Sequence, residues 1–351
     1  MTSRNCAGPT AWFLAAVGVF AQAAYGAAEP SPLFATQETL QVRIEAPLST
    51  LKSKRSDTEY LDGTFSYVDA SGAEQLLDLK LRARGRYRRQ RDTCRFPPVR
   101  LNFNKKQVMG TEFAGQDKLK LVTHCERRAS YDQYVLKEYL AYKIFNSLTE
   151  NSFGARLLQV TWIDTDRGGK AETRYAFVIE HADRLAERIG AEPVEVRSIT
   201  YADLDPEHAN LVTVFEYLIG NTDYSMVLGA VDDNCCHNIV LFSNGSPGYL
   251  AVPYDFDFSG LVNARYAEPN PKLPIKTVVR RLYRGLCGHN EHLELTLAQF
   301  RENEDEIRRV LSSVEALEEK TRNTALRYVD GFYKDIADAK AVERNLIRNC
   351  L

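Results

Sequence analysis

The chain has 351 residues, of which 44% are hydrophobic, so it is long enough to form one large domain or two modest ones around a sizeable core. Its 45 Lys and Arg residues nearly balance 47 Asp and Glu residues, and the formal net charge of −2 excludes a general attraction to nucleic acid or to an anionic membrane. The 18 Tyr and 16 Phe residues indicate an ordered globular chain and argue against disorder.

The first 28 residues are typical of a signal peptide. Arg4 gives a short positive start, residues 11–24 form an apolar core that is too short to span a bilayer stably, and small residues at 24–28 offer cleavage sites. An uncleaved membrane anchor is the alternative. No other run of the sequence is long or apolar enough to cross a membrane. We therefore expect a secreted or periplasmic protein with no stable membrane span once the signal is removed.

Six cysteines follow the predicted signal peptide. An even number in an exported chain predicts disulfide bonds, but six cysteines allow 15 pairings and the sequence does not select one. Zinc is disfavoured because Cys235-Cys236-His237 lacks the usual two-residue gap between ligands. We expect the adjacent Cys235 and Cys236 to bond to different partners. The six are Cys94, Cys125, Cys235, Cys236, Cys287 and Cys350.

Alternating apolar and polar residues predict strands along the first third of the chain. Leu77, Leu79 and Leu81, for example, would share one face of a strand, and Gly85 ends that run. The predicted strands cover residues 40–44, 64–68, 77–84, 99–103 and 118–123. This region is therefore expected to be rich in sheet.

The pattern changes to a helical period at residues 130–148, and two more strands are predicted at 157–163 and 174–179. The remainder is mostly helical, except for a hairpin at 238–242 and 248–252 around Asn244-Gly245, a strong turn signal. The helices expected in this part cover residues 209–218, 277–286, 293–303 and 304–348. The predicted fold class is α+β, with the change from sheet to helix near residues 181–190.

The segment Asp255-Phe256-Asp257 follows the second strand of this hairpin. On a regular extended chain, residues i and i+2 point to the same face, so both carboxylates would line one metal site while Phe256 points away. Flanking aromatic side chains exclude water and strengthen local electrostatics. The alternative is a polar turn in which both carboxylates are solvated.

Two further polar residues precede this segment in an informative order. Asp223 follows the helix at 209–218, and Asn238 stands directly before the hairpin. The order helix, Asp, Asn, hairpin, Asp is that of the phosphotransfer centre of kinase-like folds. In such a centre one carboxylate orients the attacking hydroxyl. An Asn amide oxygen and a second carboxylate bind magnesium, which prefers hard oxygen ligands.

These segments resemble the spore coat protein H (CotH) kinase-like family. Residues 220–223 read Gly-Asn-Thr-Asp and match the family's Gly-Asn-x-Asp segment, His237-Asn238 matches its His/Asn-Asn segment entering a strand, and residues 253–257 match Pro-aromatic-Asp-x-Asp. Residues 82–85, 96–101 and 136–146 match the family's Arg-Gly segment, Lys-Lys-Pro-Tyr-Arg strand and Leu-Ala-Tyr helix more weakly. The resemblance covers roughly residues 77–265.

The resemblance implies a two-lobed protein-kinase-like fold, with a sheet-rich N-lobe at about residues 29–183 and a helix-rich C-lobe at about 184–351. It implies ATP and Mg²⁺ as cofactors. It also implies that Asp223 is the catalytic base and that Asn238 and Asp255 bind magnesium. Asp257 would be a supporting carboxylate or a ligand of a second metal.

For ATP, the resemblance implies phosphate contacts from Arg84, Arg86 or Arg100, because a guanidinium group grips phosphate in a fork. The dense run of arginines at 82–95 is typical of an anion cradle or of a basic surface that docks a substrate. For each arginine alone, a solvated strand face is the alternative. Glu180, at the end of a strand near the change from sheet to helix, is predicted to lie where adenine binds.

Two features depart from the protein-kinase pattern. Kinases pair a lysine on the third strand with a helix glutamate, whereas here Arg100 occupies the nearest matching position and Glu138 is the candidate partner. In addition, Asp223 stands 15 residues before Asn238, where the kinase catalytic loop has about five. Asp233 does stand five residues before Asn238 and is the alternative base.

Three functions follow as hypotheses. The first is an exported atypical kinase that transfers the γ-phosphate of ATP to Ser or Thr of a protein substrate, whose identity stays open. The second is a catalytically inactive kinase-like protein that binds a partner, because ATP is scarce outside the cytoplasm. The third is a kinase-like fold that transfers AMP.

Overall fold

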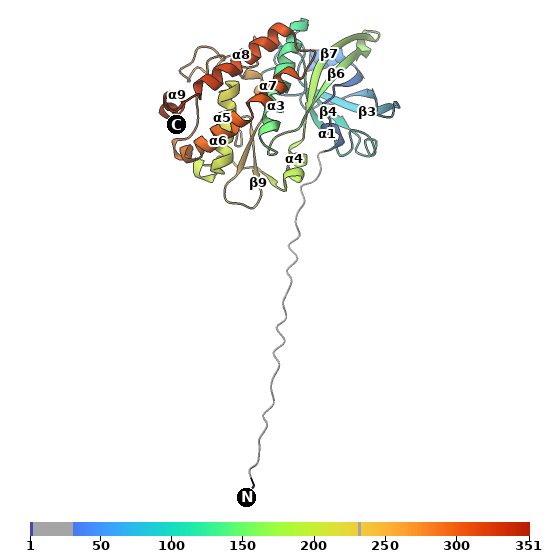
Figure 1. Ribbon diagram of the computed structural model, residues 1–351. Coiled ribbons are helices and arrows are strands. Elements are labelled where there is room, and N and C mark those ends of the chain that lie inside the picture. Colours follow the sequence, from blue (N-terminus) through green and yellow to red (C-terminus); the bar gives the residue numbers. More distant parts are fainter. Residues whose placement is uncertain (3–30, 231–232) are drawn as a thin grey trace.

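The computed structural model describes residues 1–2, 31–230 and 233–351 and contains both helices and sheets, which confirms the predicted α+β class. The predicted signal peptide lies outside the described residues apart from its first two. Figure 1 shows strands gathered on one side of the molecule and most helices on the other. No helix in the described part of the chain is long and apolar enough to cross a membrane.

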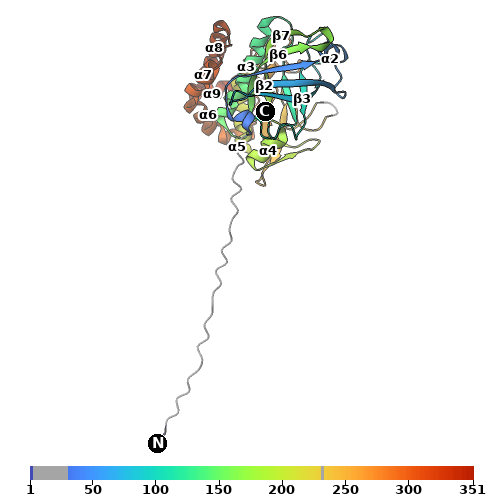
Figure 2. The ribbon, with the colours of Figure 1, turned by 90° about the vertical axis from the view of Figure 1, so that its right-hand side faces the viewer.

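Seven strands form a closed barrel in the order β1-β2-β3-β4-β5-β7-β6 (Figure 2). All neighbours are antiparallel except β1 and β6, which close the barrel in parallel with Val42 opposite Val160. The strands are β1 (Leu40–Ala46), β2 (Leu61–Val68), β3 (Glu74–Ala83), β4 (Val99–Phe103), β5 (Lys118–Val122), β6 (Ala155–Asp164) and β7 (Lys170–Ile179). Each includes residues from one of the predicted strands.

The alternation of the sequence decides which side chains fill the barrel. Leu77, Leu79 and Leu81 of β3 are buried, while the residues between them face outward. Phe65 lies at the centre of an aromatic group, with its ring 5.2 Å from that of Phe103 and 5.0 Å from that of Phe113. The barrel interior is therefore a packed core, and ligands have to bind outside it.

Helix α3 (Asp132–Leu148) joins the barrel to the helical part of the molecule. It contacts β6 and β7 on one side and α7 on another, and most of its residues are buried. Because it is enclosed by both parts, its side chains reach the space between them. Four other helices lie within residues 32–219: α1 (Pro32–Ala35), α2 (Leu48–Lys54), α4 (Ala182–Ile189) and α5 (Pro206–Ile219).

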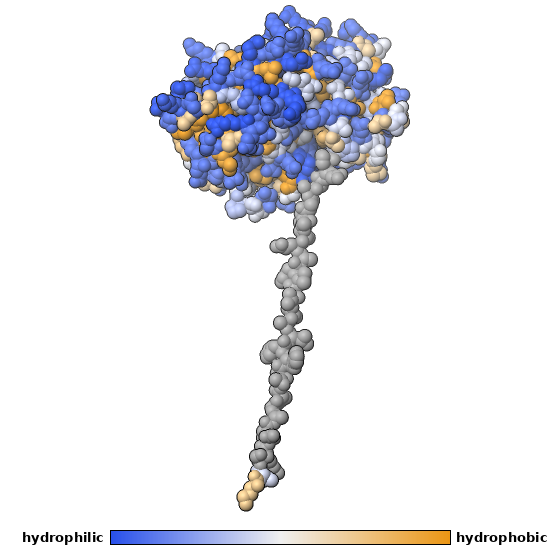
Figure 3. All heavy atoms as spheres, viewed as in Figure 1, coloured by the Kyte–Doolittle hydropathy of each residue, from blue (hydrophilic) through white to orange (hydrophobic). Residues whose placement is uncertain are grey.

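A small antiparallel sheet has the order β10-β9-β8 and contains the predicted hairpin. Its strands are β8 (Glu192–Val194), β9 (Ile239–Ser243) and β10 (Leu250–Pro253). The hairpin packs on α5, which has buried residues around its whole circumference. The surface seen in Figure 3 is mostly hydrophilic, with apolar residues in small scattered groups.

The predicted helix at 277–286 is wrong, because the chain there is irregular. Two arginines of this segment donate side-chain hydrogen bonds to the end of α5 and the turn after it. Arg281 donates to the carbonyls of Tyr217 and Leu218 at the end of α5. Arg284 donates to those of Thr222 and Tyr224. This segment therefore braces the end of α5.

The expected helix at 293–303 is confirmed as α6 (Leu293–Glu302), but the stretch 304–348 is divided into three helices. They are α7 (Glu304–Ser312), α8 (Glu319–Asp335) and α9 (Ala339–Asn345). At the first break, Gln133 of α3 donates to the carbonyl of Ala316 and accepts from the N–H of Glu318. This tertiary contact satisfies backbone groups that a continuous helix would have used itself.

The six cysteines form three pairs at disulfide distance: Cys94–Cys125, Cys235–Cys236 and Cys287–Cys350. The expectation that Cys235 and Cys236 bond to different partners is therefore wrong, because the other four cysteines pair among themselves. Disulfide pairs are typical of proteins that mature in an oxidising compartment.

Candidate functional site

Helix α5 ends directly before the first candidate catalytic residue. Gly220 caps the helix with a φ of 65°, and a Cβ at this position would collide with the hydroxyl of Tyr328. The buried side chain of Asn221 then accepts a hydrogen bond from the N–H of Asp223 at 3.0 Å. The glycine and the asparagine turn the chain sharply and fix the backbone of Asp223.

Asp223, His237 and Asn238 form one hydrogen-bonded group. Nε2 of His237 lies 2.9 Å from Oδ1 of Asp223. Nδ2 of Asn238 donates to the backbone oxygen of Asp223 at 2.6 Å and to its Oδ2 at 3.1 Å. The hydrogen bond to Asp223 raises the pKa of His237 above its usual value. Because Asn238 uses its amide nitrogen here, its amide oxygen is left to bind a cation.

Two residues of the site have a left-handed backbone conformation, which residues other than glycine seldom adopt. Asn238 has a φ of 54° and Asp255 a φ of 67°, and they are two of the four non-glycine residues with positive φ in the described chain. The N–H of Asp255 donates to the hydroxyl of Tyr142, on α3, at 2.9 Å. Strained backbone of this kind concentrates at functional sites, where surrounding contacts hold it in place.

Phe256 anchors the segment that follows β10. Its ring is fully buried, 4.6 Å from the ring of Tyr142 and 5.3 Å from that of Phe215. Residues Phe256–Phe258 form a 3-10 turn after the left-handed Asp255, so the expected regular extended chain is wrong. Because the turn buries Phe256 inward, Asp255 and Asp257 still both line the same cleft.

Asp257 and Glu138 share one buried arginine. Arg88 lies 3.6 Å from Asp257 and 3.9 Å from Glu138. Burial and the neighbouring Asp255 raise the pKa of Asp257 to about 7, while burial and Asp257 raise the pKa of Glu138 well above its usual value. Oε1 of Glu138 has no hydrogen-bond partner among the described residues. This excess of carboxylates over cations would be relieved by a bound cation, so the residues fit a metal ion.

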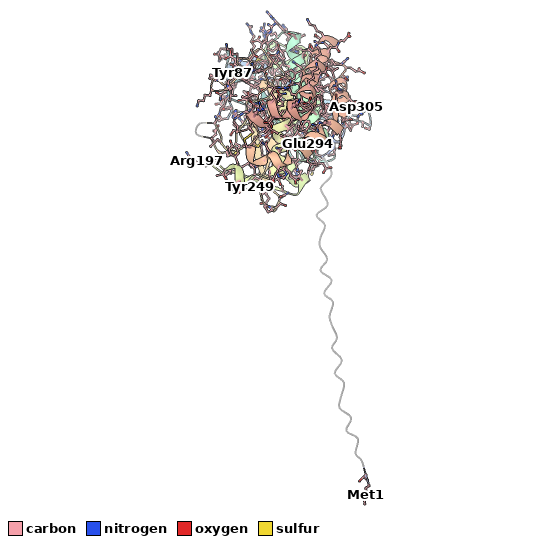
Figure 4. The ribbon with its side chains drawn as sticks, turned by 60° about the vertical axis from the view of Figure 1, so that its left-hand side comes forward. Met1, Tyr87, Arg197, Tyr249, Glu294 and Asp305 are labelled. Carbon is pink, nitrogen blue, oxygen red and sulfur yellow. A yellow bond between two sulfur atoms is a disulfide. The ribbon has the colours of Figure 1, made fainter. Side chains whose placement is uncertain are left out.

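A cleft of about 890 Å³, within the size range of ligand-binding pockets, brings the candidate residues together. One wall comes from the barrel and the loop after β3, and the rest of the lining from residues 181–183, 193–195 and residues between 223 and 258. The ring of Tyr87 lies 5.3 Å from that of Phe258 across the two walls. Figure 4 shows Tyr87 at the edge of the molecule opposite Asp305 of α7. The predicted site residues that line the cleft are Arg84, Arg86, Asp223, Asp233, Asn238, Asp255 and Asp257.

The alternative base, Asp233, is engaged by an arginine. Nη1 and Nη2 of Arg86 each donate to one of its carboxylate oxygens at 2.6 Å. Both side chains are accessible to solvent at the mouth of the cleft. Among the described residues no arginine pairs with Asp223, whose carboxylate is held by His237 and Asn238 instead.

Arg100 does not line the cleft, so its position does not support the predicted contact with phosphate. It stands in a row on the outer face of the barrel, opposite Arg82 on β3 and Lys120 on β5. Of these neighbouring side chains, Lys120 lines the cleft and Arg100 does not. Glu138 likewise has Arg88 as its cationic neighbour, and not Arg100 as expected.

Glu180 also has a structural place. Its buried carboxylate accepts from the N–H of Gly154 at 2.8 Å and pairs with Arg188 at 2.8 Å. It does not line the cleft. The prediction that Glu180 contacts adenine is therefore not supported by its position, because its oxygens hold the turn before β6 against α4.

Lys120 is the residue that sequence reasoning missed. Its Nζ lies 4.0 Å from the centre of the Tyr254 ring and lines the cleft. Burial, followed by the charge of Arg84, lowers its pKa to about 7. A signal was present, since Lys120 stands between Leu119 and Leu121 on the strand that directly precedes the helix carrying Glu138.

In the residues that the structure describes, no three His, Cys, Asp or Glu side chains are grouped so as to hold a metal ion by themselves. A cation in this cleft would therefore need the amide oxygen of Asn238 and ligands from a bound molecule. Magnesium is bound in this way at phosphate sites, through one or two carboxylates and substrate phosphates.

Comparison of the chain with models of protein families and with curated proteins gave no match.

Proposed function

We propose that the protein is an exported phosphotransferase of protein-kinase-like build that uses ATP and Mg²⁺ to phosphorylate Ser or Thr of a protein substrate. The observation that carries the proposal is the convergence of Asp223, Asn238 and Asp255 on one cleft, with left-handed backbone at both Asn238 and Asp255. These residues come from the end of a helix, the start of a hairpin and its end, as in kinase phosphotransfer centres.

The proposed role of each residue follows from which of its polar atoms remain available to a ligand. Asp223 accepts the proton of the attacking hydroxyl, because its carboxylate is partly exposed and held by neutral or weakly basic donors. Asn238 and Asp255 hold magnesium, and Asp257 supports it from the buried side. Magnesium supplies positive charge against the phosphates when it is bound.

The cationic side chains on the barrel side of the cleft would pair with the phosphates of ATP. Lys120 stands on the strand before α3, where kinases carry their lysine, and Arg84 and Arg86 follow β3, two strands away in the barrel. The usual lysine–glutamate pair is modified here, because Arg88 occupies the place beside Glu138. Arg88 therefore orients Asp257, and Lys120 is left for the ligand.

The element order also supports the proposal. Barrel strands, one enclosed helix, two further strands and then a mainly helical part follow one another as in the N-lobe and C-lobe of kinases, with the change near residue 183. The three cysteine pairs are in keeping with a secreted or periplasmic location.

Labelled ATP with purified protein and a panel of protein substrates, including the protein itself, tests the proposal. We expect transfer that requires Mg²⁺. Asp223→Asn should reduce it by about two to four orders of magnitude, the usual contribution of general acid–base catalysis. Asp233→Asn is the matched control and should retain activity. The opposite ranking of these two variants would assign the base to Asp233.

Mass analysis of the product separates phosphate transfer from AMP transfer. A phosphoryl increment supports the proposal, and an adenylyl increment contradicts it. Thermal unfolding with ATP and Mg²⁺ addresses the inactive alternative. Ligand at 100 times its dissociation constant should stabilise the protein by about 2.7 kcal/mol. Equal melting temperatures with and without ATP, in wild type and in Asp255→Ala, would favour a protein that only binds a partner.

A further inference from the structure

A second hollow lies at the end of the barrel where β5 and β6 finish. It consists of two cavities of about 340 Å³ and 490 Å³. They adjoin, since they share the lining residues Lys52, Phe96, His124, Arg127, Arg167 and Glu172. Neither shares a lining residue with the cleft that contains Asp223 and Asp255. We call this hollow the barrel-end site.

The barrel-end site is strongly basic. Seven Lys or Arg residues line it, against three carboxylates. Each carboxylate is already paired: Asp164 with Lys52 at 3.8 Å, Glu126 with Arg95 at 3.3 Å and Glu172 with Arg174 at 3.1 Å. In the part of the chain that the structure describes, five of the seven cations make no ion pair: Arg55, Arg91, Arg127, Arg167 and Lys170. The site therefore has positive charge that its own carboxylates leave uncompensated.

The floor of the site is fixed by covalent and polar contacts. The guanidinium group of Arg55 donates to the carbonyls of Arg89, Gln90, Cys94 and Arg95. The Cys94–Cys125 disulfide joins the same loop to the end of β5. These contacts hold the loop before β4 in one conformation, so the site is formed before any ligand arrives.

Two buried polar side chains in the site have an unused nitrogen. His124 is 4% exposed and Trp162 is 3% exposed. Nδ1 of His124 and Nε1 of Trp162 have no hydrogen-bond partner among the described residues. Their rings flank Phe96, at 4.8 Å and 4.9 Å from its ring. Buried polar groups without partners are rare in folded proteins, and the indole N–H can only donate.

Burial and the charges of Arg174, Arg88 and Lys52 hold the pKa of His124 well below its usual value. The ring is therefore neutral at physiological pH, and one of its nitrogens carries a proton. Both unpartnered nitrogens are enclosed, so a negatively charged ligand in the hollow would be held by the uncompensated cations.

We propose that the barrel-end site binds a tetrahedral oxoanion, a phosphate or sulfate group, with Arg127 and Arg167 as donors at its rim and the ring of Trp162 in its lining. An oxoanion has several acceptor oxygens, and arginine binds such groups through two parallel hydrogen bonds. The inference does not rest on the proposed kinase function, since it uses other residues at another place.

The sequence provides a probe at the site itself. The chain has two tryptophans, Trp12 and Trp162, and Trp12 lies outside the described residues. In the full chain with Trp12→Phe, the indole N–H of Trp162 gives a single ¹⁵N resonance. Titration with inorganic phosphate at constant ionic strength should shift this resonance saturably, with a dissociation constant of roughly 1 mM or below. Chloride at the same ionic strength should not.

Variants at the rim test the assignment without touching the core. Arg127 and Arg167 are exposed, so the double variant Arg127→Gln/Arg167→Gln should fold normally. It should weaken phosphate binding at Trp162 by about tenfold or more. Arg197→Gln/Lys320→Gln removes the same charge from exposed positions elsewhere and should leave the affinity unchanged; Arg197 projects from the surface in Figure 4.

The results of these titrations distinguish specific binding of an oxoanion from an effect of net charge. No saturable shift with phosphate or sulfate up to roughly 50 mM, far above a millimolar constant, would overturn the proposal. Equal weakening by both double variants would also overturn it, since the effect would then be one of net charge. If binding is present, comparison of inorganic phosphate with a phosphoserine peptide identifies the source. Tighter binding of the peptide indicates that the natural ligand is a phosphorylated protein. Tighter binding of inorganic phosphate indicates that it is the free ion.

Discussion

Replacing Lys120 by methionine should stabilise the unliganded protein at neutral pH. The ammonium group of Lys120 lies against the Tyr254 ring, and no hydrogen bond or ion pair to it is found in the described residues. Burial, then the like charge of Arg84, lowers its pKa from 10.5 to about 7. Methionine has a similar length and no charge, so it removes the unfavourable burial while keeping the contact with the ring.

The magnitude follows from linkage between protonation and folding. Between pH 7 and 10.5 the unfolded chain binds a proton at Lys120 that the folded chain has released, so wild-type stability rises with pH across this window. Each unit of pKa difference corresponds to about 1.4 kcal/mol. The advantage of Lys120→Met in the free energy of unfolding should therefore fall from about 5 kcal/mol at pH 6.5 to about 2 kcal/mol at pH 9.

Urea unfolding of both proteins at several pH values, without reductant, measures this difference. Lys118→Met is a matched control, since Lys118 is an exposed residue on the same strand and should show no such trend. An advantage that stays constant between pH 6.5 and 9, or a variant less stable than wild type at pH 6.5, would refute the reasoning. The same variant should bind ATP more weakly, because Lys120 is assigned to the phosphates.

Three further variants probe other parts of the site. Burial raises the pKa of Glu216 to about 8 from 4.5, so wild-type stability should fall as pH rises through this window; Glu216→Gln should remove the fall, seen by urea unfolding at pH 5 and pH 8. Arg188→Ala leaves the buried carboxylate of Glu180 unpaired and should destabilise the protein by about 3 kcal/mol, while ATP binding measured by calorimetry stays unchanged. Phe256→Ala should reduce the free energy of unfolding by about 3–5 kcal/mol and lower ATP affinity as well, because its packing fixes the carboxylates on either side.

Much of the site could be predicted from chain order. Asp223, Asn238 and Asp255 each stand at the boundary of an element with a clear local signal, namely a helix end at glycine or a hairpin with an Asn-Gly turn. Since the hairpin brings its two ends together, the sequence was enough to place Asn238 and Asp255 in one cleft. The barrel strands were predictable for the same reason, because their side chains alternate with a period of two.

The rest depends on contacts between distant segments. Arg100 and Lys120 both occupy outward positions on neighbouring strands, yet only Lys120 lines the cleft. Glu180 is a carboxylate at the end of a strand, where a site residue is often found, but it is paired with Arg188 of α4. The helix expected at 277–286 fails because Arg281 binds carbonyls of another helix. Local periodicity carries no information about such partners.

The parallel pairing of β1 with β6 has a consequence for how the chain acquires its fold. The barrel has no closing pair until residues 155–164 meet residues 40–46, and α3 lies between those two segments in sequence. Contacts so far apart along the chain form late and favour an all-or-none transition. Because α3 carries Glu138 and Tyr142, which contact Arg88 and Asp255, the ordered cleft depends on the closed barrel as well as on residues 223–258 that follow it in the chain.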